Sequence, residues 1–361
     1  MASPSHPPPL RRGGRAPAAA DDFCLARAHR YREPVTAPSD LLVLPGMAEE
    51  LQRVSVALRE AVVTDDAYFT ELTSHLVQAG GKLLRPALAV AAGAVADPSS
   101  PVSHDVVLGG VSVELVQIGS LYHDDVMDEA LTRRSVESVN ARWGNLRAIL
   151  AGDFLLAKAS EIAASLGTEV AALLAATIGR MCEGQVRELQ TTFDIRRTEE
   201  QYVAAIDGKT ASLFASAARI GALVVELPRA DVDSLTTFGH RFGMAFQVVD
   251  DILDVVATDE QLGKPAGQDL AEGIYTYPAI RALQNPAVAD ELASLLGRTL
   301  DRDDVDRARK LVRTGDAVEA ATSLARSHCT EAVTALDELP DNAAVDHLRT
   351  MATNLLDHVP A

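Results

Sequence analysis

From Leu41 to the C-terminus, apolar residues recur every three or four positions, and this spacing constrains the fold of the 361-residue chain more than any other feature. Such a period places apolar side chains on one face of an α-helix. It runs through 48–63, 69–79, 86–96, 104–128, 146–166, 168–192, 198–206, 210–224, 230–258, 277–284 and several later segments. No convincing run of strict alternation, the pattern of strands, is found. The sequence therefore predicts an all-α fold.

The first forty residues differ from the rest. Residues 1–40 are rich in Pro, Ala and Arg and have no hydrophobic period, which predicts a disordered extension. We expect one domain to follow, over residues 41–361. An organelle transit peptide is the alternative interpretation of residues 1–40, and the proline cluster disfavours it because a transit peptide forms an amphipathic helix.

The charge of the chain limits its partners. The formal net charge is −18, which repels nucleic acid and anionic membrane surfaces and disfavours both as general partners. An anionic substrate would need local clusters of Lys and Arg, or metal ions bridging to carboxylates. Five lysines are present in all, and Lys82, Lys209 and Lys264 lie in the motifs described below.

Cysteine usage and hydropathy indicate a cytoplasmic protein without a membrane span. The three cysteines, Cys24, Cys182 and Cys329, are far apart, which fits a reducing compartment rather than a disulfide framework or a zinc site. No apolar stretch reaches the roughly eighteen uninterrupted residues of a membrane helix.

One local pattern occurs twice. Asp124, Asp125 and Asp128 end a long apolar helical segment, and Asp250, Asp251 and Asp254 follow another. Residues four apart share a helix face, so Asp124 aligns with Asp128 and Asp250 with Asp254. Like charges at this spacing are unfavourable unless cations neutralise them.

Mg²⁺ suits such carboxylates, because it keeps open coordination positions that substrate phosphates can fill. The alternative is that each cluster is an acidic helix end in solvent. Two copies embedded in apolar helices make coincidence less credible. If they face each other, they can hold several cations around one diphosphate.

Basic residues form a second pattern. In the segment Gly80 to Pro86, two glycines permit close approach to a ligand, and Lys82 and Arg85 can reach the same anion. Arg133 and Arg134 follow the first aspartate cluster. A continuous helix would turn Arg133 away from Asp124, so we expect the helix to end near Asp128 and the arginine pair to return on a loop. Guanidinium pairs suit phosphate oxygens.

These motifs resemble the trans-prenyl diphosphate synthase family. The resemblance rests on GGKLLRP at 80–86, DDVMD at 124–128 with Arg133 and Arg134, GKT at 208–210, FQVVDDILD at 246–254 and GKPAGQDL at 263–270. It covers the chain from about residue 50 to the C-terminus. The family implies a single-domain helical bundle around a deep central cavity, and a homodimer.

The resemblance also implies site residues. Asp124, Asp128 and Asp250 would bind about three Mg²⁺ ions, and Asp125, Asp251 and Asp254 would complete the catalytic clusters. The allylic diphosphate would contact the side chains of Arg133, Lys209, Thr210, Gln247 and Lys264. Isopentenyl diphosphate would contact those of Lys82, Arg85, Gln117 and Arg134. Two positions depart from the family pattern: Ile274 replaces a common lysine, and Tyr277 replaces a common leucine.

The implied reaction is Mg²⁺-dependent prenyl transfer: an allylic diphosphate ionises, isopentenyl diphosphate attacks, and a proton is lost. In this family the depth of the cavity below the first cluster sets product length. Gly119 and Ser120 lie one turn before Asp124 and are small, which predicts an open passage and a product of C30 to C50 for quinone side chains, from a farnesyl or geranylgeranyl diphosphate starter. A bulky residue on another helix could instead close the cavity.

Three other functions remain. A short-chain synthase would stop at C15 to C20. A terpene cyclase would need neither a second DDxxD nor GGKLLRP. A silent subunit of a heteromeric synthase would be expected to lack metal-binding aspartates, whereas all are present here.

Overall fold

The computed structural model describes residues 44–262 and 265–359, and almost all of its regular structure is helical, so the predicted all-α class is confirmed. The predictions for residues 1–40 and for Lys264 lie outside the described residues. The helices are α1 (Met47–Ala61), α2 (Ala67–Gln78), α3 (Leu84–Ala94), α4 (His104–Met127), α5 (Val139–Trp143), α6 (Asn145–Ser165), α7 (Thr168–Leu189), α8 (Glu199–Ile206), α9 (Ser212–Leu223), α10 (Arg229–Val256), α11 (Asp259–Leu262), α12 (Gln268–Ala271), α13 (Tyr277–Leu283), α14 (Ala289–Leu295), α15 (Arg302–Val312), α16 (Ala317–Thr334) and α17 (Ala343–Asn354), followed by a 3-10 turn (Leu355–His358).

Capping residues and glycines set the helix ends. The Asp66 carboxylate accepts a hydrogen bond from the backbone N–H of Tyr68 at 2.8 Å and so caps α2. Thr198 forms a capping box with Gln201 at the start of α8. Gly167, with a φ of 117°, separates α6 from α7. Because such signals are local, the predicted ends of the ten helical segments agree with the observed ends to within three residues.

The short helices α5, α11 and α12 were not predicted, and neither were two elements of other kinds. A hairpin follows α4, in which β1 (Thr132–Arg133) pairs antiparallel with β2 (Val136–Glu137). Its turn residues, Arg134 and Ser135, have φ values of 52° and 62°, as in a type I′ turn, but the usual Asn-Gly signal is missing. The second is a π-helix, Asp207–Ala211, between α8 and α9.

Helix α4 is central to the core. It packs against α3, α6 and α9, while α10 packs against α9 and α16. By length and composition alone α4 could cross a membrane, although Glu114 interrupts it, and 72% of its apolar window is buried inside the protein. Its hydropathy is therefore that of a core helix. A smaller apolar cluster joins α12, α13, α14 and α15.

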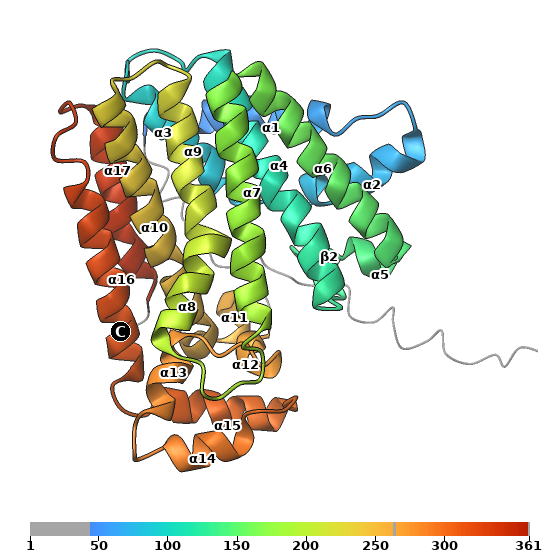
Figure 1. The fold of residues 1–361 in the computed structure, drawn as a ribbon, viewed down its shortest axis with the longest axis vertical. Coiled ribbons are helices and arrows are strands. Elements are labelled where there is room, and N and C mark those ends of the chain that lie inside the picture. The colour runs from blue at the N-terminus through green and yellow to red at the C-terminus, as the bar shows by residue number, and fades with distance from the viewer. Residues whose placement is uncertain (1–43, 263–264, 360–361) are drawn as a thin grey trace, which may run out of the picture. The chain divides into compact units, whose positions relative to one another are not determined.

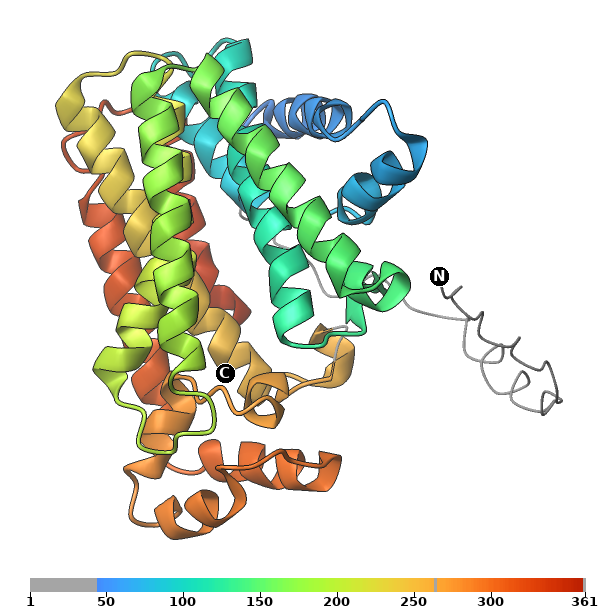
Figure 2. The ribbon, with the colours of Figure 1, turned by 45° about the vertical axis from the view of Figure 1, so that its right-hand side comes forward.

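Three long helices end together. Helices α4, α7 and α10 run in the same direction, and their C-terminal ends lie in the lower half of Figures 1 and 2, above α14 and α15. The β1–β2 hairpin, α11 and α12 lie at this end too. The connectivity therefore brings both aspartate clusters to one end of the helices.

Candidate active site

The first aspartate cluster ends α4. The helix stops at Met127, and Asp128 is its C-cap, as the sequence predicted. Asp125 is fully buried, and its Oδ1 accepts hydrogen bonds from Arg133 Nε at 2.7 Å and Nη2 at 2.6 Å. Asp124 is half-buried and Asp128 is exposed. Asp125 therefore fastens the hairpin to the helix, while Asp124 and Asp128 remain nearer the surface.

The second cluster also contains one aspartate near the surface beside a buried one. Asp250 is exposed, whereas Asp251 is buried. The Asp251 carboxylate accepts hydrogen bonds from Tyr202 Oη at 2.5 Å and from Gln247 Nε2 at 2.9 Å. Burial raises the pKa of Asp251 to about 7, although both hydrogen bonds oppose that shift.

Asp254 lies four residues after Asp250 on α10, as expected, but it is buried whereas Asp250 is exposed. The Asp254 carboxylate is buried and accepts from the backbone N–H groups of Gln268 at 3.3 Å and Asp269 at 3.2 Å. These N–H groups open α12, and helix N-termini attract carboxylates. The chain after α10 folds back, so the Asp254 carboxylate caps the N-terminus of α12.

The carboxylates nearer the surface fit a divalent cation. Burial raises the pKa of Asp124 to about 6, and Asp128 and Glu188 add like charge. Among the described residues, no three His, Cys, Asp or Glu side chains come close enough to hold a metal by themselves. Mg²⁺ is commonly held by one or two carboxylates together with substrate phosphates. Asp124, Asp128 and Asp250 therefore fit a cation that a diphosphate also binds.

An ion pair lies between the two clusters. Lys209 Nζ, in the π-helix, donates to Glu188 Oε1 of α7 at 2.5 Å. Burial lowers the pKa of Lys209, but the charges of Glu188, Asp124 and Asp128 outweigh it and hold that pKa above its usual value. The Glu188 charge also acts on Asp251. Lys209 and Glu188 thus link the two clusters electrostatically.

The π-helix is held from two sides. The Asp207 carboxylate contacts His240 Nε2 of α10 at 2.5 Å and Arg180 Nη2 of α7 at 2.9 Å. The His240 hydrogen bond lowers the pKa of Asp207 to about 2. At the other end, Thr210 Oγ1 donates to Gln247 Oε1 at 2.7 Å. These contacts fix Lys209 and Thr210 against α7 and α10.

The predicted isopentenyl diphosphate residues surround the start of α3. Arg134 Nη1 donates to the carbonyl oxygens of Gly80 at 2.6 Å and Leu76 at 3.1 Å. A Cβ at Gly81 would lie 2.8 Å from the Arg134 guanidinium carbon, which explains the glycine. A cavity of about 300 Å³ adjoins Gly80, Gly81 and Arg134.

The other residues predicted to contact isopentenyl diphosphate are Arg85, Lys82 and Gln117. The guanidinium of Arg85 lies 4.4 Å from the Phe214 ring centroid. Burial lowers the pKa of Arg85 to about 10, against the opposing charge of Glu114. Lys82 is exposed and Gln117 is half-buried on α4. The structure thus brings Arg85 and Arg134 to one place, with Lys82 at its edge.

The sequence assigned no role to Glu114, and it left open whether Glu188, on a polar helix face with Glu183, supports the metal ligands or lies in solvent. Glu114 is buried on α4, and its Oε1 lies 3.4 Å from Arg134 Nη2. Burial raises its pKa, while Arg134 and Arg85 oppose the shift. A single acid inside an apolar helical segment was the available signal. Glu188 shares its helix with exposed Glu183, so only burial distinguishes the two.

Gly119 and Ser120, the two positions predicted to affect product length, have different surroundings. A Cβ at Gly119 would lie 3.1 Å from the Gly152 carbonyl oxygen and 3.2 Å from Leu156 Cγ, so Gly119 faces α6. Ser120 is half-buried and donates to the Gln117 carbonyl oxygen at 2.9 Å. Gly119 therefore lets α4 and α6 approach, and Ser120 is the more suitable position for testing the passage.

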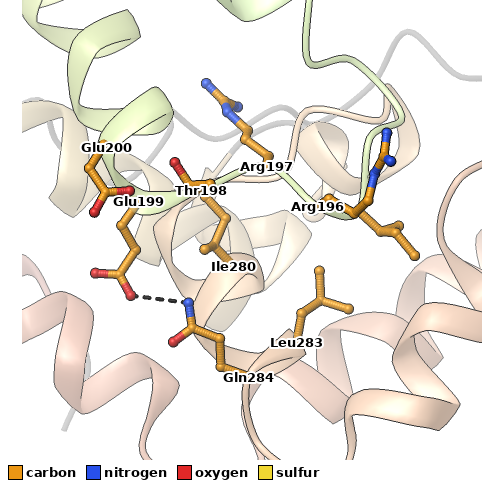
Figure 3. A pocket seen from close by; sticks show the side chains of 9 residues that line it. Arg196, Arg197, Thr198, Glu199, Glu200, Ile280, Leu283 and Gln284 are labelled. Carbon is orange, nitrogen blue, oxygen red and sulfur yellow. Dashed lines mark hydrogen bonds between the residues drawn. The ribbon is translucent and has the colours of Figure 1, made fainter.

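A further cavity, of about 370 Å³, lies between the start of α8 and α13 (Figure 3). Glu199, Gln284 and Leu283 line it, and Glu199 Oε1 accepts from Gln284 Nε2 at 3.2 Å. None of the predicted diphosphate or metal residues lines this cavity. It is therefore separate from the candidate site.

An all-helical fold that brings two aspartate-bearing helix ends together defines an isoprenoid-synthase-type protein. The chain belongs to the polyprenyl synthetase family, whose model matches residues 66–313.

Among its relatives, heptaprenyl diphosphate synthase component 2 of Geobacillus stearothermophilus is 35% identical over 85% of this chain and 95% of its own length. The nonaprenyl diphosphate synthase of Mycobacterium tuberculosis is 36% identical over 83% of this chain and 88% of that protein. A polyprenyl synthase from Caulobacter crescentus, solved with calcium and isoprenyl diphosphate, superposes with a TM-score of 0.82 at 31% identity, covering 91% of this chain and 100% of that one.

Proposed function

We propose that this protein condenses isopentenyl diphosphate onto an allylic diphosphate, as a long-chain trans-polyprenyl diphosphate synthase. The observation that carries this proposal is the meeting of both aspartate clusters with the Lys209–Glu188 pair at one end of the helices. Family membership supports it. So do the relatives named as heptaprenyl and nonaprenyl synthases.

Asp124, Asp128 and Asp250 would hold Mg²⁺, about three ions in all, which would stabilise the departing pyrophosphate. Lys209 would exchange its Glu188 partner for an oxygen of the allylic diphosphate. Arg133, fixed by Asp125, and Thr210, fixed by Gln247, would orient the same group. Lys264 completes this proposed set.

Lys82, Arg85, Arg134 and Gln117 would hold isopentenyl diphosphate near the start of α3. The apolar helices below exclude water, which protects an allylic cation from hydrolysis. No side-chain nucleophile is needed, because the double bond of isopentenyl diphosphate attacks the allylic carbon. The proton that is then lost passes to the released pyrophosphate.

The first experiment incubates purified protein with labelled isopentenyl diphosphate and Mg²⁺. Dimethylallyl, geranyl, farnesyl or geranylgeranyl diphosphate is supplied separately, and the products are sized by mass. A ladder ending at C30 to C50 supports the proposal. A stop at C15 or C20 keeps the reaction and contradicts the product length. No incorporation from any starter contradicts activity of the chain alone and favours a subunit of a heteromeric enzyme.

Product length has its own test at Ser120. We expect Ser120→Phe to shorten the product by one or more five-carbon units without lowering the melting temperature, because the added ring enters the passage. Ser120→Ala serves as the control and should leave product length unchanged. An unaltered ladder in Ser120→Phe would place the passage elsewhere.

A heteromeric enzyme is a second candidate, because one relative is named as component 2 of its synthase. We propose instead a cytoplasmic homodimer. Activity of the purified chain alone separates these candidates, since a heteromeric subunit would be inactive until its partner is added.

A further inference from the structure

Arg197 is a buried cation that the proposed reaction does not use. It precedes α8 and is 4% exposed. Its Nη1 donates to the Tyr275 carbonyl oxygen at 3.1 Å, while its Nε and Nη2 are buried without a hydrogen-bond partner. In Figure 3 its side chain points away from Glu199 and Gln284. Arg197 is among the residues that line the cavity between α8 and α13, but its hydrogen bond goes to the Tyr275 carbonyl oxygen, which lies outside that lining.

A guanidinium buried with one hydrogen bond is costly unless carboxylates balance its charge. Burial lowers the pKa of Arg197, and the charges of Glu188, Asp251 and Asp269 oppose this shift. Two of the three lie in the candidate site: Glu188 pairs with Lys209, and Asp251 belongs to the second cluster.

Tyr202 joins Arg197 to the second cluster by contact. The guanidinium carbon of Arg197 lies 5.7 Å from the Tyr202 ring centroid, and the Tyr202 hydroxyl donates to Asp251. The carbonyl that Arg197 binds belongs to Tyr275, which follows Ile274. At Ile274 the sequence resemblance implied a lysine, so Arg197 brings a positive charge from another element to a segment that lacks that lysine.

We propose that Arg197 is a positioning residue whose fixed charge, acting through Glu188, Asp251 and Tyr202, sets the balance between metal and diphosphate binding. The proposal rests on the proposed function. Because the guanidinium nitrogens are buried, Arg197 acts on the ligands through these neighbours. Its charge repels cations that bind alone and attracts a diphosphate.

This role predicts opposite effects on two ligands. In Arg197→Met the site becomes more negative, so Mn²⁺, used as a probe for Mg²⁺, should bind at least about threefold more tightly without diphosphate. Pyrophosphate in saturating Mg²⁺ should bind at least about threefold more weakly. A purely structural role would weaken both affinities together.

The experiment measures both affinities by calorimetry and monitors folding by melting temperature. Arg196→Met is the matched control, because the Arg196 side chain is 86% exposed and pairs with Asp194; both of its affinities should equal those of the wild type. Arg197→Lys, which keeps the charge, should also retain them. If Arg197→Met does not fold, Arg197→Gln, which keeps a donor for Tyr275, takes its place.

Parallel weakening of both ligands, or no change in either, overturns the proposal. So does an Arg197→Lys variant that behaves like Arg197→Met, because charge would then not be the cause. If the wild type itself binds no pyrophosphate with Mg²⁺, the proposed function fails instead, so the two failures are distinguishable.

Discussion

At the level of single residues, burial divides the six aspartates of the two DDxxD motifs into two kinds. Three carboxylates are buried and bound to protein groups: Asp125 by Arg133, Asp251 by Tyr202 and Gln247, and Asp254 by the first N–H groups of α12. The other three, Asp124, Asp128 and Asp250, are partly or fully exposed. They are the three that the sequence resemblance implied as metal ligands.

This division predicts different consequences for Asp250 and Asp254. We expect Asp250→Asn to lower turnover at least about a hundredfold without changing the melting temperature, because an exposed charge needed only in the reaction is lost. Asp254→Ala should cost about 1 kcal/mol of unfolding free energy, because α12 loses its cap. Steady-state kinetics and thermal unfolding test both variants. Equal destabilisation by both would contradict the division.

The raised pKa of Asp124 predicts a pH-dependent difference in stability. The pKa of Asp124 in the folded state, about 6, exceeds that of an ordinary aspartate, so the folded state keeps this proton to a higher pH than the unfolded state does. The free energy of unfolding therefore decreases as pH rises from about 4 to 6. In metal-free protein, Asp124→Asn should therefore be nearly neutral at low pH. Near pH 7.5 it should be stabilising by about 1–2 kcal/mol, allowing for solvent screening.

Unfolding at several pH values, compared between wild type and Asp124→Asn, measures this difference and cancels the titration of other groups. Asp65→Asn, an exposed change between α1 and α2, is the control. A difference that is constant with pH would contradict the assignment.

At the level of elements, the π-helix depends on a close approach to α7. A Cβ at Gly184 would lie 2.3 Å from the Lys209 backbone nitrogen and 2.8 Å from the Ala205 carbonyl oxygen. Backbone atoms cannot yield as a flexible side chain can. Gly184 therefore allows α7 to lie against the element that carries Lys209.

We expect Gly184→Ala to destabilise the protein by about 2 kcal/mol and to reduce activity, because α7 must move away from the π-helix. The matched control is Gly179→Ala on the same helix, where an added Cβ meets nothing within 4 Å. That change should stabilise the protein by about 0.5–1 kcal/mol, since alanine favours a helix. Denaturant unfolding and activity assays measure both, and similar results for the two variants would exclude the close-approach explanation.

At the level of the whole molecule, α6 carries an exposed apolar surface that suits a homodimer. Leu146, Ile149 and Leu150 share one side of the helix, and Leu146 and Leu150 are 72% and 53% exposed. Contiguous apolar surface of this kind commonly marks an interface. We expect Leu146→Glu with Leu150→Glu to give a monomer in sedimentation analysis. Val56→Glu on α1, also at an exposed apolar position, should leave the oligomeric state unchanged.

The sequence by itself determined the helices and indicated the residues of the candidate site, because periodicity, caps and the aspartate and arginine motifs depend on neighbours along the chain. Tertiary structure decided which aspartates are structural, that Glu188 is buried while Glu183 is exposed, and that Gly119 faces α6. It also decided that Arg197 contacts the ring of Tyr202, whose hydroxyl donates to Asp251 of the second cluster. These properties depend on which distant elements pack together, and burial, which sets the pKa values and the roles of charged groups, exists only after that packing.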